Sequence, residues 1–233
     1  LVRTGNSTLF KGDFFTRGLP NIYETSLHLR VEKLATTVAD LKTIYPAIKF
    51  PPNLNTLGLI SYTGRLDGFV TDFVSDGKLV TSIGSATTDM NFKYDRNKNK
   101  SSYSGYLALN AFDLGQFFGD TVNLGKVSLD TRIKGGGLTL ESLHADLLGN
   151  IATITLRGYN YRDMKVNGAV FQKSFKGKLT VRDKYLDMNF EGKVDLTQKI
   201  PEFNFTAEVH KADLQKLNLT KADISVAANL NSN

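Results

Sequence analysis

The sequence predicts an all-β protein in which one long antiparallel sheet curves into an open, taco-like groove with an apolar inner surface. Three observations support this fold class: apolar and polar residues alternate over most of the chain, glycine recurs in the frame apolar-x-Gly-x-apolar, and helical periodicity is limited to a few short turns. Alternation with a period of two sends successive side chains to opposite faces of a strand. The predicted sheet therefore has one apolar face and one polar face.

The glycine frame is the evidence for curvature. It occurs at residues 10–14, 62–66, 103–107, 166–170, 175–179 and 190–194. Glycine inside a strand marks a bend or a close approach of another backbone. A bend that is repeated in strand after strand curves the whole sheet, so we expect a curved wall.

The alternating segments assign the two faces of that wall. The clearest are residues 27–32, 127–133, 152–157, 186–191 and 203–210. The apolar positions that we expect to line the groove are Leu27, Leu29, Val31, Val127, Leu129, Ile133, Ala152, Ile154, Leu156, Leu186, Met188, Phe190, Phe203, Phe205, Ala207 and Val209. The polar positions expected to face water include Asp130, Thr155, Asp187, Glu191 and Asn204.

Helical periodicity predicts three short turns, at Val38 to Tyr45, Asp113 to Phe118 and Ala212 to Leu217. In the first of them Thr37 is the candidate N-cap, and Pro46 ends the segment. Related phrases containing Asp-Leu follow an alternating strand each time. We expect the aspartates of these phrases to cap the turns and not to act in catalysis; they are Asp40, Asp113 and Asp213.

Turn signals divide the remaining chain into short strands. They lie at residues 51–53, 75–77, 135–137, 148–150, 182–184 and 199–201. The divisions predict about fourteen strands, and at ~4.8 Å per strand the sheet would extend for about 65 Å. No stretch has the composition of a disordered linker, so residues 1–233 are expected to form one continuous unit. Because the chain opens at Leu1 and closes on a strand-like segment, we expect it to be a piece of a longer protein.

The composition excludes several kinds of site. Cysteine is absent, which rules out disulfides, thiolate metal sites and a cysteine nucleophile. No apolar run approaches the ~20 residues of a transmembrane helix, so any membrane anchor is expected outside this chain. The 29 Lys and Arg residues exceed the 23 Asp and Glu residues, and the net charge of +6 weakly favours anionic surfaces. We interpret the basic cluster at residues 93–100 as a solvated hairpin tip and not as a phosphate-binding arm.

The residues do not assemble into catalytic, metal or cofactor chemistry. His28, His144 and His210 are far apart in the sequence, and the motifs of hydrolases, zinc proteases and nucleotide-binding loops do not occur. Binding nucleic acid by stacking needs aromatic and basic residues on one face. Here the Phe residues share the apolar face, whereas the basic residues lie on the opposite one. We therefore predict a protein that is not an enzyme, needs no cofactor or metal, and binds no nucleic acid.

Several phrases of the chain resemble TamB-like proteins of the AsmA superfamily, particularly those of Bacteroidetes. They cover most of the chain and comprise residues 10–14, 18–25, 39–41 before Pro46, 71–73, 88–91, 125–130 and 203–219. The resemblance implies a translocation and assembly module protein that is anchored in the inner membrane and crosses the periplasm as a long β-groove, apolar within. It also implies a role in outer-membrane biogenesis, through transport of phospholipids between the two membranes and, with an Omp85-type outer-membrane barrel, through assembly of outer-membrane proteins and protein secretion.

Reasoning from the residues agrees on the groove and leaves its cargo open. A curved sheet without a second sheet must cover its apolar face with something, and phospholipid acyl chains would serve. Two alternatives remain at this stage. In the first, the apolar faces pack on each other in a β-sandwich that serves as a structural module. In the second, the sheet binds unfolded strands along its edge and acts as an assembly chaperone.

Overall fold

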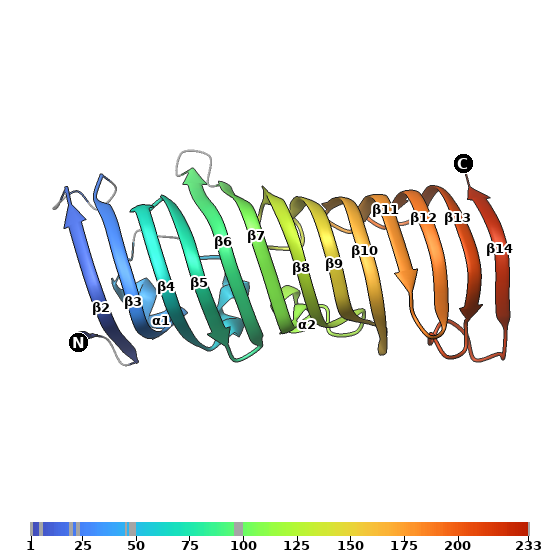
Figure 1. The fold of residues 1–233 in the computed structure, drawn as a ribbon, viewed down its shortest axis with the longest axis horizontal. Coiled ribbons are helices and arrows are strands. Elements are labelled where there is room, and N and C mark those ends of the chain that lie inside the picture. Colours follow the sequence, from blue (N-terminus) through green and yellow to red (C-terminus); the bar gives the residue numbers. More distant parts are fainter. Residues whose placement is uncertain are drawn as a thin grey trace.

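The chain folds into a single antiparallel sheet whose strands lie side by side in sequence order (Figure 1). The computed structural model describes residues 2–4, 7–18, 21, 24–44, 46, 50–95 and 100–232. Of these described residues, 69% are in strands and 8% are in helices, and the sheet does not close into a barrel. The fourteen strands are β1 (Val2–Thr4), β2 (Thr8–Arg17), β3 (Ser26–Thr37), β4 (Leu59–Phe69), β5 (Asp72–Thr81), β6 (Gly84–Asp95), β7 (Lys100–Asp113), β8 (Leu124–Gly136), β9 (His144–Leu156), β10 (Tyr159–Phe171), β11 (Ser174–Arg182), β12 (Leu186–Asp195), β13 (Glu202–Asp213) and β14 (Ser225–Ser232).

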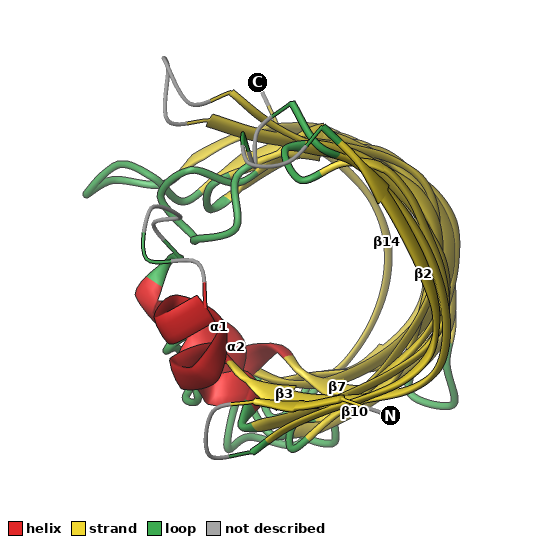
Figure 2. Cartoon of the chain, turned by 90° about the vertical axis from the view of Figure 1, so that its left-hand side faces the viewer, coloured by secondary structure: helices red, strands yellow, loops and turns green. Residues whose placement is uncertain are grey.

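The sheet is curled across its strands into an open trough. Seen along its long axis, it has a C-shaped cross-section with the mouth on one side (Figure 2). Every strand pairs with its sequence neighbours, and in the described part of the chain no second sheet packs against the concave face. The prediction of an all-β, curved, antiparallel groove is therefore confirmed, and the β-sandwich alternative does not describe this sheet.

Glycines on the concave face allow the bend. The register aligns Gly168, Gly177 and Gly192 directly across β10, β11 and β12. At Gly177 the backbone has φ +152, and an added Cβ would lie 2.4 Å from the carbonyl oxygen of Asn167. No other residue fits such a position, because the next strand occupies the space that a side chain needs.

Two of the predicted turns are such bends inside strands. Residues 75–77 lie in the middle of β5, and residues 148–150 lie in the middle of β9. Gly77 pairs with Gly64, and Gly149 pairs with Val166, so both glycines continue the ladder instead of ending it. A third predicted turn, at residues 51–53, opens the 3-10 helix η1 (Pro52–Leu57).

The short helices lie along one long edge of the trough, which we call the helical lip (Figure 2). Helix α1 (Val38–Ile44) follows β3, η1 precedes β4, and α2 (Leu114–Phe118) follows β7. Their positions agree with two of the predicted turns, although Tyr45 lies outside the described residues. The third predicted turn, after Ala212, is a hydrogen-bonded turn in which the Leu217 N–H donates to the Asp213 carbonyl over 3.0 Å.

Two of the three predicted aspartate caps are confirmed. The Asp113 carboxylate accepts the Gln116 N–H at 2.9 Å, and Asp213 accepts the Lys216 N–H at 3.0 Å. Asp40 is different, because Thr37 caps its helix by accepting the Asp40 N–H at 3.2 Å. The Asp40 carboxylate is buried and instead accepts hydrogen bonds from the Ser7 N–H and the Thr8 hydroxyl, at 2.7 and 2.9 Å, tying α1 to the start of β2.

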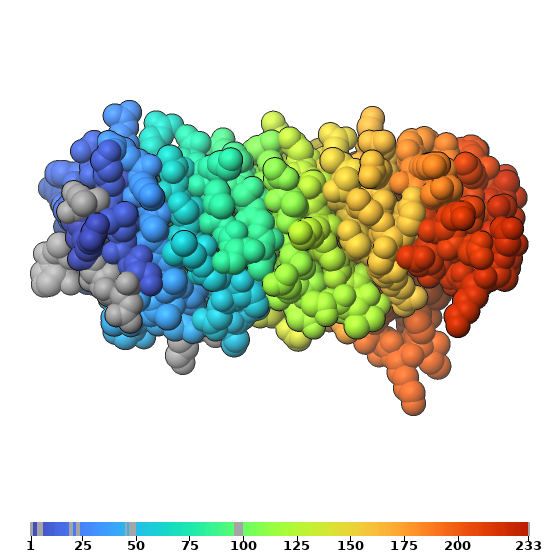
Figure 3. Space-filling view, turned by 90° about the horizontal axis from the view of Figure 1, so that it is seen from below, coloured from blue at the N-terminus to red at the C-terminus, as the bar shows by residue number. Residues whose placement is uncertain are grey.

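The opposite long edge of the trough, which we call the loop lip, consists of hairpin loops. Strand β8 begins at the helical lip after α2 and ends at the loop lip with Gly136, where residues 137–143 lead into β9. The hairpin between β6 and β7 also lies there, with Asp95 paired to Lys100; its tip, which holds Arg96 and Lys98 of the predicted basic cluster, lies outside the described residues. Seen from below, the sequence colours follow one another along the long axis of the molecule (Figure 3).

Candidate functional site: the concave face of the sheet

The concave face carries no charged side chain among the strand positions that the structure describes. Cross-strand register places Leu29, Leu66, Ser75 and Met90 in one row of this face, and the row continues through Gly105, Ile133, Leu147, Gly168, Gly177, Gly192 and Phe205. The next row runs from Gly12 through Val31, Gly64, Gly77, Thr88, Leu107, Thr131, Gly149, Val166, Leu179 and Phe190 to Ala207. A wall of apolar residues, glycines and a few hydroxyl side chains thus extends from β2 to β13.

Aromatic side chains concentrate near the two ends of this wall. At the C-terminal end, Phe190 lies 5.2 Å from Phe205 and 6.1 Å from Phe175, measured between ring centroids. Towards the N-terminal end, Phe10 lies 6.2 Å from Phe14 on β2, and nearer the middle of the sheet Phe73 stacks on Phe92 at 5.5 Å. These rings are only partly buried, and Phe203 keeps 44% of its surface exposed. Apolar surface of this kind is left for a partner or a ligand to cover.

The part of the wall next to the helical lip is covered by the protein itself. Val127 is 1% exposed and belongs to a core that contains Val38 of α1, Leu57 of η1 and Phe112, with Leu129 and Ile154 packed against it. A second core around Val181 and Leu217 takes up more of the predicted groove residues, namely Leu156, Leu186, Met188 and Val209. These predicted residues lie on the concave face as expected, but they contribute to the hydrophobic core.

The predicted residues that remain on the open wall are fewer. Leu27, Leu29, Phe190, Phe203 and Phe205 are half-buried or exposed and belong to none of the buried cores. Val31 and Ala207 lie in the same rows but are buried, at 3% and 7% exposure. Ile133 packs in a third cluster with Met90, Tyr103 and Leu138.

Ala152 was predicted on the groove face, and the structure contradicts this. Ser128 of β8 pairs with Thr153, whereas Leu129 pairs with Ile151, so Ala152 is the extra residue of a β-bulge. The bulge reverses the alternation within β9. Ala152 consequently lies on the convex side, while Ile154 and Leu156 keep the concave side.

A chain of hydroxyl groups crosses the wall at the glycine bend. The Tyr62 hydroxyl donates to the Arg65 carbonyl at 2.8 Å and lies 3.0 Å from the Ser75 hydroxyl, which lies 3.1 Å from the Thr88 hydroxyl. The pKa of the Tyr62 hydroxyl is raised above its usual value, mainly because the ring is buried. The pKa of Tyr103, also on the concave face, rises to about 12 because the ring is buried. The hydroxyls of Tyr62, Ser75 and Thr88 hydrogen-bond to one another, and the Tyr103 hydroxyl donates to the Gly137 carbonyl at 3.2 Å. None of these groups carries a charge at neutral pH, so the wall stays electrostatically neutral.

The convex face carries the charges. Lys178 and Glu191 are paired at 3.1 Å, and Arg65 and Asp76 at 2.8 Å, with all four side chains largely exposed. The predicted water-facing residues Asp130, Glu191 and Asn204 lie on this side. Exposed pairs of this type contribute little stability; their consequence is that polarity is divided sharply between the two faces.

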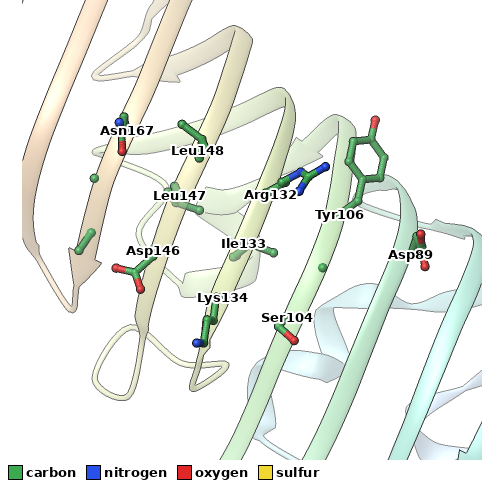
Figure 4. A pocket seen from close by; sticks show the side chains of 13 residues that line it. Asp89, Ser104, Tyr106, Arg132, Ile133, Lys134, Asp146, Leu147, Leu148 and Asn167 are labelled. Atoms are coloured by element: carbon green, nitrogen blue, oxygen red, sulfur yellow. The ribbon is translucent and has the colours of Figure 1, made fainter.

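A hollow on the convex face does not have the arrangement of a catalytic site. It has a volume of about 910 Å³ and is lined by outward side chains of β6 to β10, among them Asp89, Arg132 and Asp146 (Figure 4). Acidic and basic groups are mixed there on open strands, without a nucleophile and base in contact. Acid–base catalysis needs a positioned pair within hydrogen-bond reach, and the hollow does not supply one.

The histidines form no site in the described chain. His28 contacts Asp67 at 3.0 Å on the convex face, His144 contacts the Ser142 carbonyl at 3.0 Å, and His210 lies 3.7 Å from Glu208. The described residues contain no cluster of three or more His, Cys, Asp or Glu that is able to hold a metal ion. They also contain no helix that is long and apolar enough to span a membrane.

Sequence reasoning missed the residues that shape the mouth of the trough. Asn53 of η1 and Leu138 of the loop lip lie outside the alternating segments, so periodicity gives them no role. Other missed wall residues, such as Phe73, Phe92 and Phe175, follow the same alternation as the predicted ones and were recoverable from it. Comparison of the chain with protein-family models, curated proteins and solved structures finds no match, so the geometry of the groove carries the functional argument.

Proposed function

We propose that this chain is a segment of a lipid-conducting groove, which holds phospholipid acyl chains against its concave face and lets them move along the sheet. The observation that carries the proposal is the continuous uncharged wall across the described strands, half-exposed where the helices do not cover it. Its open stretches are apolar and repetitive, without a polar group placed to fix one ligand. Such a surface suits a ligand that is apolar along its length and that has to slide.

The free energy available is sufficient for acyl chains. Each buried CH₂ contributes ~0.8 kcal/mol, so half of a sixteen-carbon chain contributes about 6 kcal/mol before ordering costs. A charged side chain placed in the wall removes part of that gain, because an unpaired charge strongly resists leaving water. The headgroup remains in water on the open side of the trough.

The chain's resemblance to TamB-like proteins adds a cellular setting to the proposal. In that setting the groove lies in the periplasm, is held at the inner membrane by a segment outside this chain, and delivers phospholipid for outer-membrane biogenesis. An Omp85-type barrel in the outer membrane is the proposed partner. Periplasmic fractionation of the natural protein, and co-purification with such a barrel, test these points separately from lipid binding.

Photo-crosslinking from paired positions tests the proposal directly. Neighbouring residues on one strand face opposite sides, so Phe205 is matched with Asn204 in β13 and Leu29 with Arg30 in β3. With a benzophenone amino acid at each position and vesicles of phosphatidylethanolamine and phosphatidylglycerol, we expect phospholipid adducts from Phe205 and Leu29 and none from Asn204 and Arg30. Equal labelling from both faces contradicts the groove proposal.

A second candidate function is addition of an unfolded strand beside β14, the last strand of the sheet in the described chain. This edge strand, Ser225–Ser232, contains no Pro and no charged residue, the devices that usually protect an edge. The chaperone function predicts that the substitutions Ala227→Lys and Asn229→Lys together weaken binding of an unfolded outer-membrane β-barrel polypeptide and leave lipid adducts at Phe205 unchanged. Unchanged polypeptide binding in that variant contradicts it.

A further inference from the structure

A hydrogen bond spans the mouth of the trough near its middle. The Asn53 side-chain amide donates to the Leu138 carbonyl, with 2.7 Å between Nδ2 and the oxygen. Asn53 belongs to η1, which leads directly into β4 at the helical lip, whereas Leu138 follows β8 at the loop lip. The two residues therefore approach from opposite long edges of the sheet. The helical lip and the loop lip face each other across the mouth of the C-shaped cross-section (Figure 2).

Both ends of this bridge are anchored on the concave wall. Phe50, Leu54 and Leu57 pack in the core under the helical lip. On the other side, Leu138 packs against Met90, Tyr103 and Ala145, and the Tyr103 hydroxyl donates to the Gly137 carbonyl at 3.2 Å. We call residues 50–57 together with residues 137–143 the strap.

The wall beneath the strap differs from the wall on either side of it. Its rows contain Ser75, Thr88 and Thr131, which are buried, and Phe92 packs in the same cluster as Leu138. The aromatic pairs Phe10–Phe14 of β2 and Phe190–Phe205 of β12 and β13 lie outside it towards the two ends. A headgroup travelling along the open side meets the strap. The strap thus separates two stretches of apolar wall.

The bridging contact is incompletely satisfied. Asn53 Oδ1 is buried and has no hydrogen-bond partner, although Nδ2 is bonded. A buried acceptor without a partner favours any arrangement in which it is solvated. Among the described residues one hydrogen bond joins the two sides of the strap, and the unpaired acceptor beside it opposes that bond. Such a contact is expected to open while each side stays packed on its own part of the wall.

We propose that the strap is a gate between two lipid-holding compartments, and that a phospholipid passes from one to the other only when the Asn53–Leu138 contact opens. The N-terminal compartment contains Phe10, Phe14 and Leu29, and the C-terminal one contains Phe175, Phe190 and Phe205. This inference rests on the proposed lipid function, and it adds the point at which movement is controlled.

A reversible covalent lock tests the gate, because the natural chain contains no cysteine that would compete for the disulfide. The variant Asn53→Cys with Leu138→Cys is tethered by an N-terminal His tag to phosphatidylcholine vesicles that contain a nickel-chelating lipid and a phospholipid with a diazirine in its acyl chain. Photolabelling is then mapped by mass spectrometry. With the disulfide reduced, both compartments are labelled; with it formed, labelling at Phe190 and Phe205 falls to the unirradiated background while labelling at Phe14 and Leu29 persists.

A matched lock on the convex face controls for oxidation and stiffening. The variant Lys178→Cys with Glu191→Cys joins residues that pair directly across β11 and β12, away from the mouth, and oxidation should leave both compartments labelled. In a second test, Asn53→Asp keeps the shape of the side chain but removes its donor. We expect labelling of the C-terminal compartment to become about fivefold faster, the factor equivalent to the ~1 kcal/mol net value of a hydrogen bond.

The outcomes separate the two proposals. Equal labelling of both compartments in the oxidised strap variant, with its disulfide verified by mass, or an unchanged labelling rate in Asn53→Asp, overturns the gate and leaves the lipid groove standing. Absence of labelling in the N-terminal compartment of the reduced form overturns the lipid groove, and the gate falls with it.

Discussion

At the scale of single residues, the curvature depends on positions where the next strand comes too close for a side chain. Gly177 and Gly119 both have positive φ, at +152 and +75, but their surroundings differ. A Cβ on Gly177 would meet the Asn167 carbonyl oxygen at 2.4 Å, whereas a Cβ on Gly119 would have no atom within 4 Å. Comparing substitutions at the two glycines therefore distinguishes the cost of an unusual φ from the cost of a clash with the neighbouring strand.

We predict that Gly177→Ala destabilises the fold far more than Gly119→Ala. Strain at an unusual φ costs about 1–3 kcal/mol at a single site, and only the Gly177 variant adds a clash with the neighbouring strand. Urea denaturation followed by circular dichroism measures both free energies of unfolding. Equal losses in the two variants would show that the close strand approach is unimportant.

Charge placed in the wall should act differently at two predicted groove residues. Ile154 packs against both hydrophobic cores, so Ile154→Arg buries an unpaired charge and should unfold the chain or cost several kcal/mol. Phe205 is on the open wall, so Phe205→Arg should retain the melting transition and lose lipid adducts at Phe190. Melting curves and photo-crosslinking check both; an intact Ile154→Arg protein would contradict the assignment of that residue to the core.

The buried phenol of Tyr103 makes stability depend on pH in the alkaline range. Its pKa rises from 10.0 to about 12 because of burial, so the folded state binds this proton more tightly than the unfolded state. The resulting stability is fully present below pH 10 and is lost as the pH rises through about 12. Absorbance of tyrosinate against pH should show a late step that is missing in Tyr103→Phe; an identical titration contradicts the prediction.

At the scale of elements, three similar Asp-Leu phrases have two different roles. Asp113 and Asp213 accept N–H groups of the turn that follows them. Asp40 reaches back to Ser7 and Thr8 instead, because Thr37 already provides the cap. The phrase therefore predicts a turn after a strand, while the contacts of its aspartate depend on what lies next to it.

We expect Asp113→Ala to cost about 1 kcal/mol, the usual value of an N-cap. Asp40→Ala should cost more, since it removes a buried carboxylate that accepts both the Ser7 N–H and the Thr8 hydroxyl. Thermal unfolding of the two variants, with Asp213→Ala as a second cap variant, measures the difference. A smaller loss for Asp40→Ala than for Asp113→Ala would contradict the role assigned to Asp40.

At the scale of the whole molecule, a single sheet forms both the apolar wall and the scaffold that supports it. Its strands follow sequence order, so each successive hairpin lengthens the trough. The helices pack only along the helical lip. Distant parts of the chain meet at the strap, where Asn53 contacts Leu138, and after β13, where the Asn218 amide donates to the Arg157 carbonyl. The trough is thus stabilised mainly by pairing between neighbours.

Far-ultraviolet circular dichroism should report a strand-dominated chain with a helix content near the 8% of the structure. This lies well below the roughly one third of residues that is helical in an average globular protein. The spectrum of the Gly119→Ala variant serves as a folded reference. A helix content of a third or more would contradict the sheet as a description of the protein in solution.

The sequence by itself determined the fold class, the polarity of the two faces and the positions of the turns after Val38 and Asp113. These follow from alternation and capping, which act between residues that are close in the chain. Only the tertiary structure decided that Gly77 and Gly149 bend strands instead of ending them, since a bend and a turn have the same local composition. It also decided that a bulge turns Ala152 outward, that Ile154 is core while Phe205 is open wall, and that Asn53 meets Leu138. Each of these depends on register or on contacts between residues far apart in sequence, which periodicity within one strand does not encode.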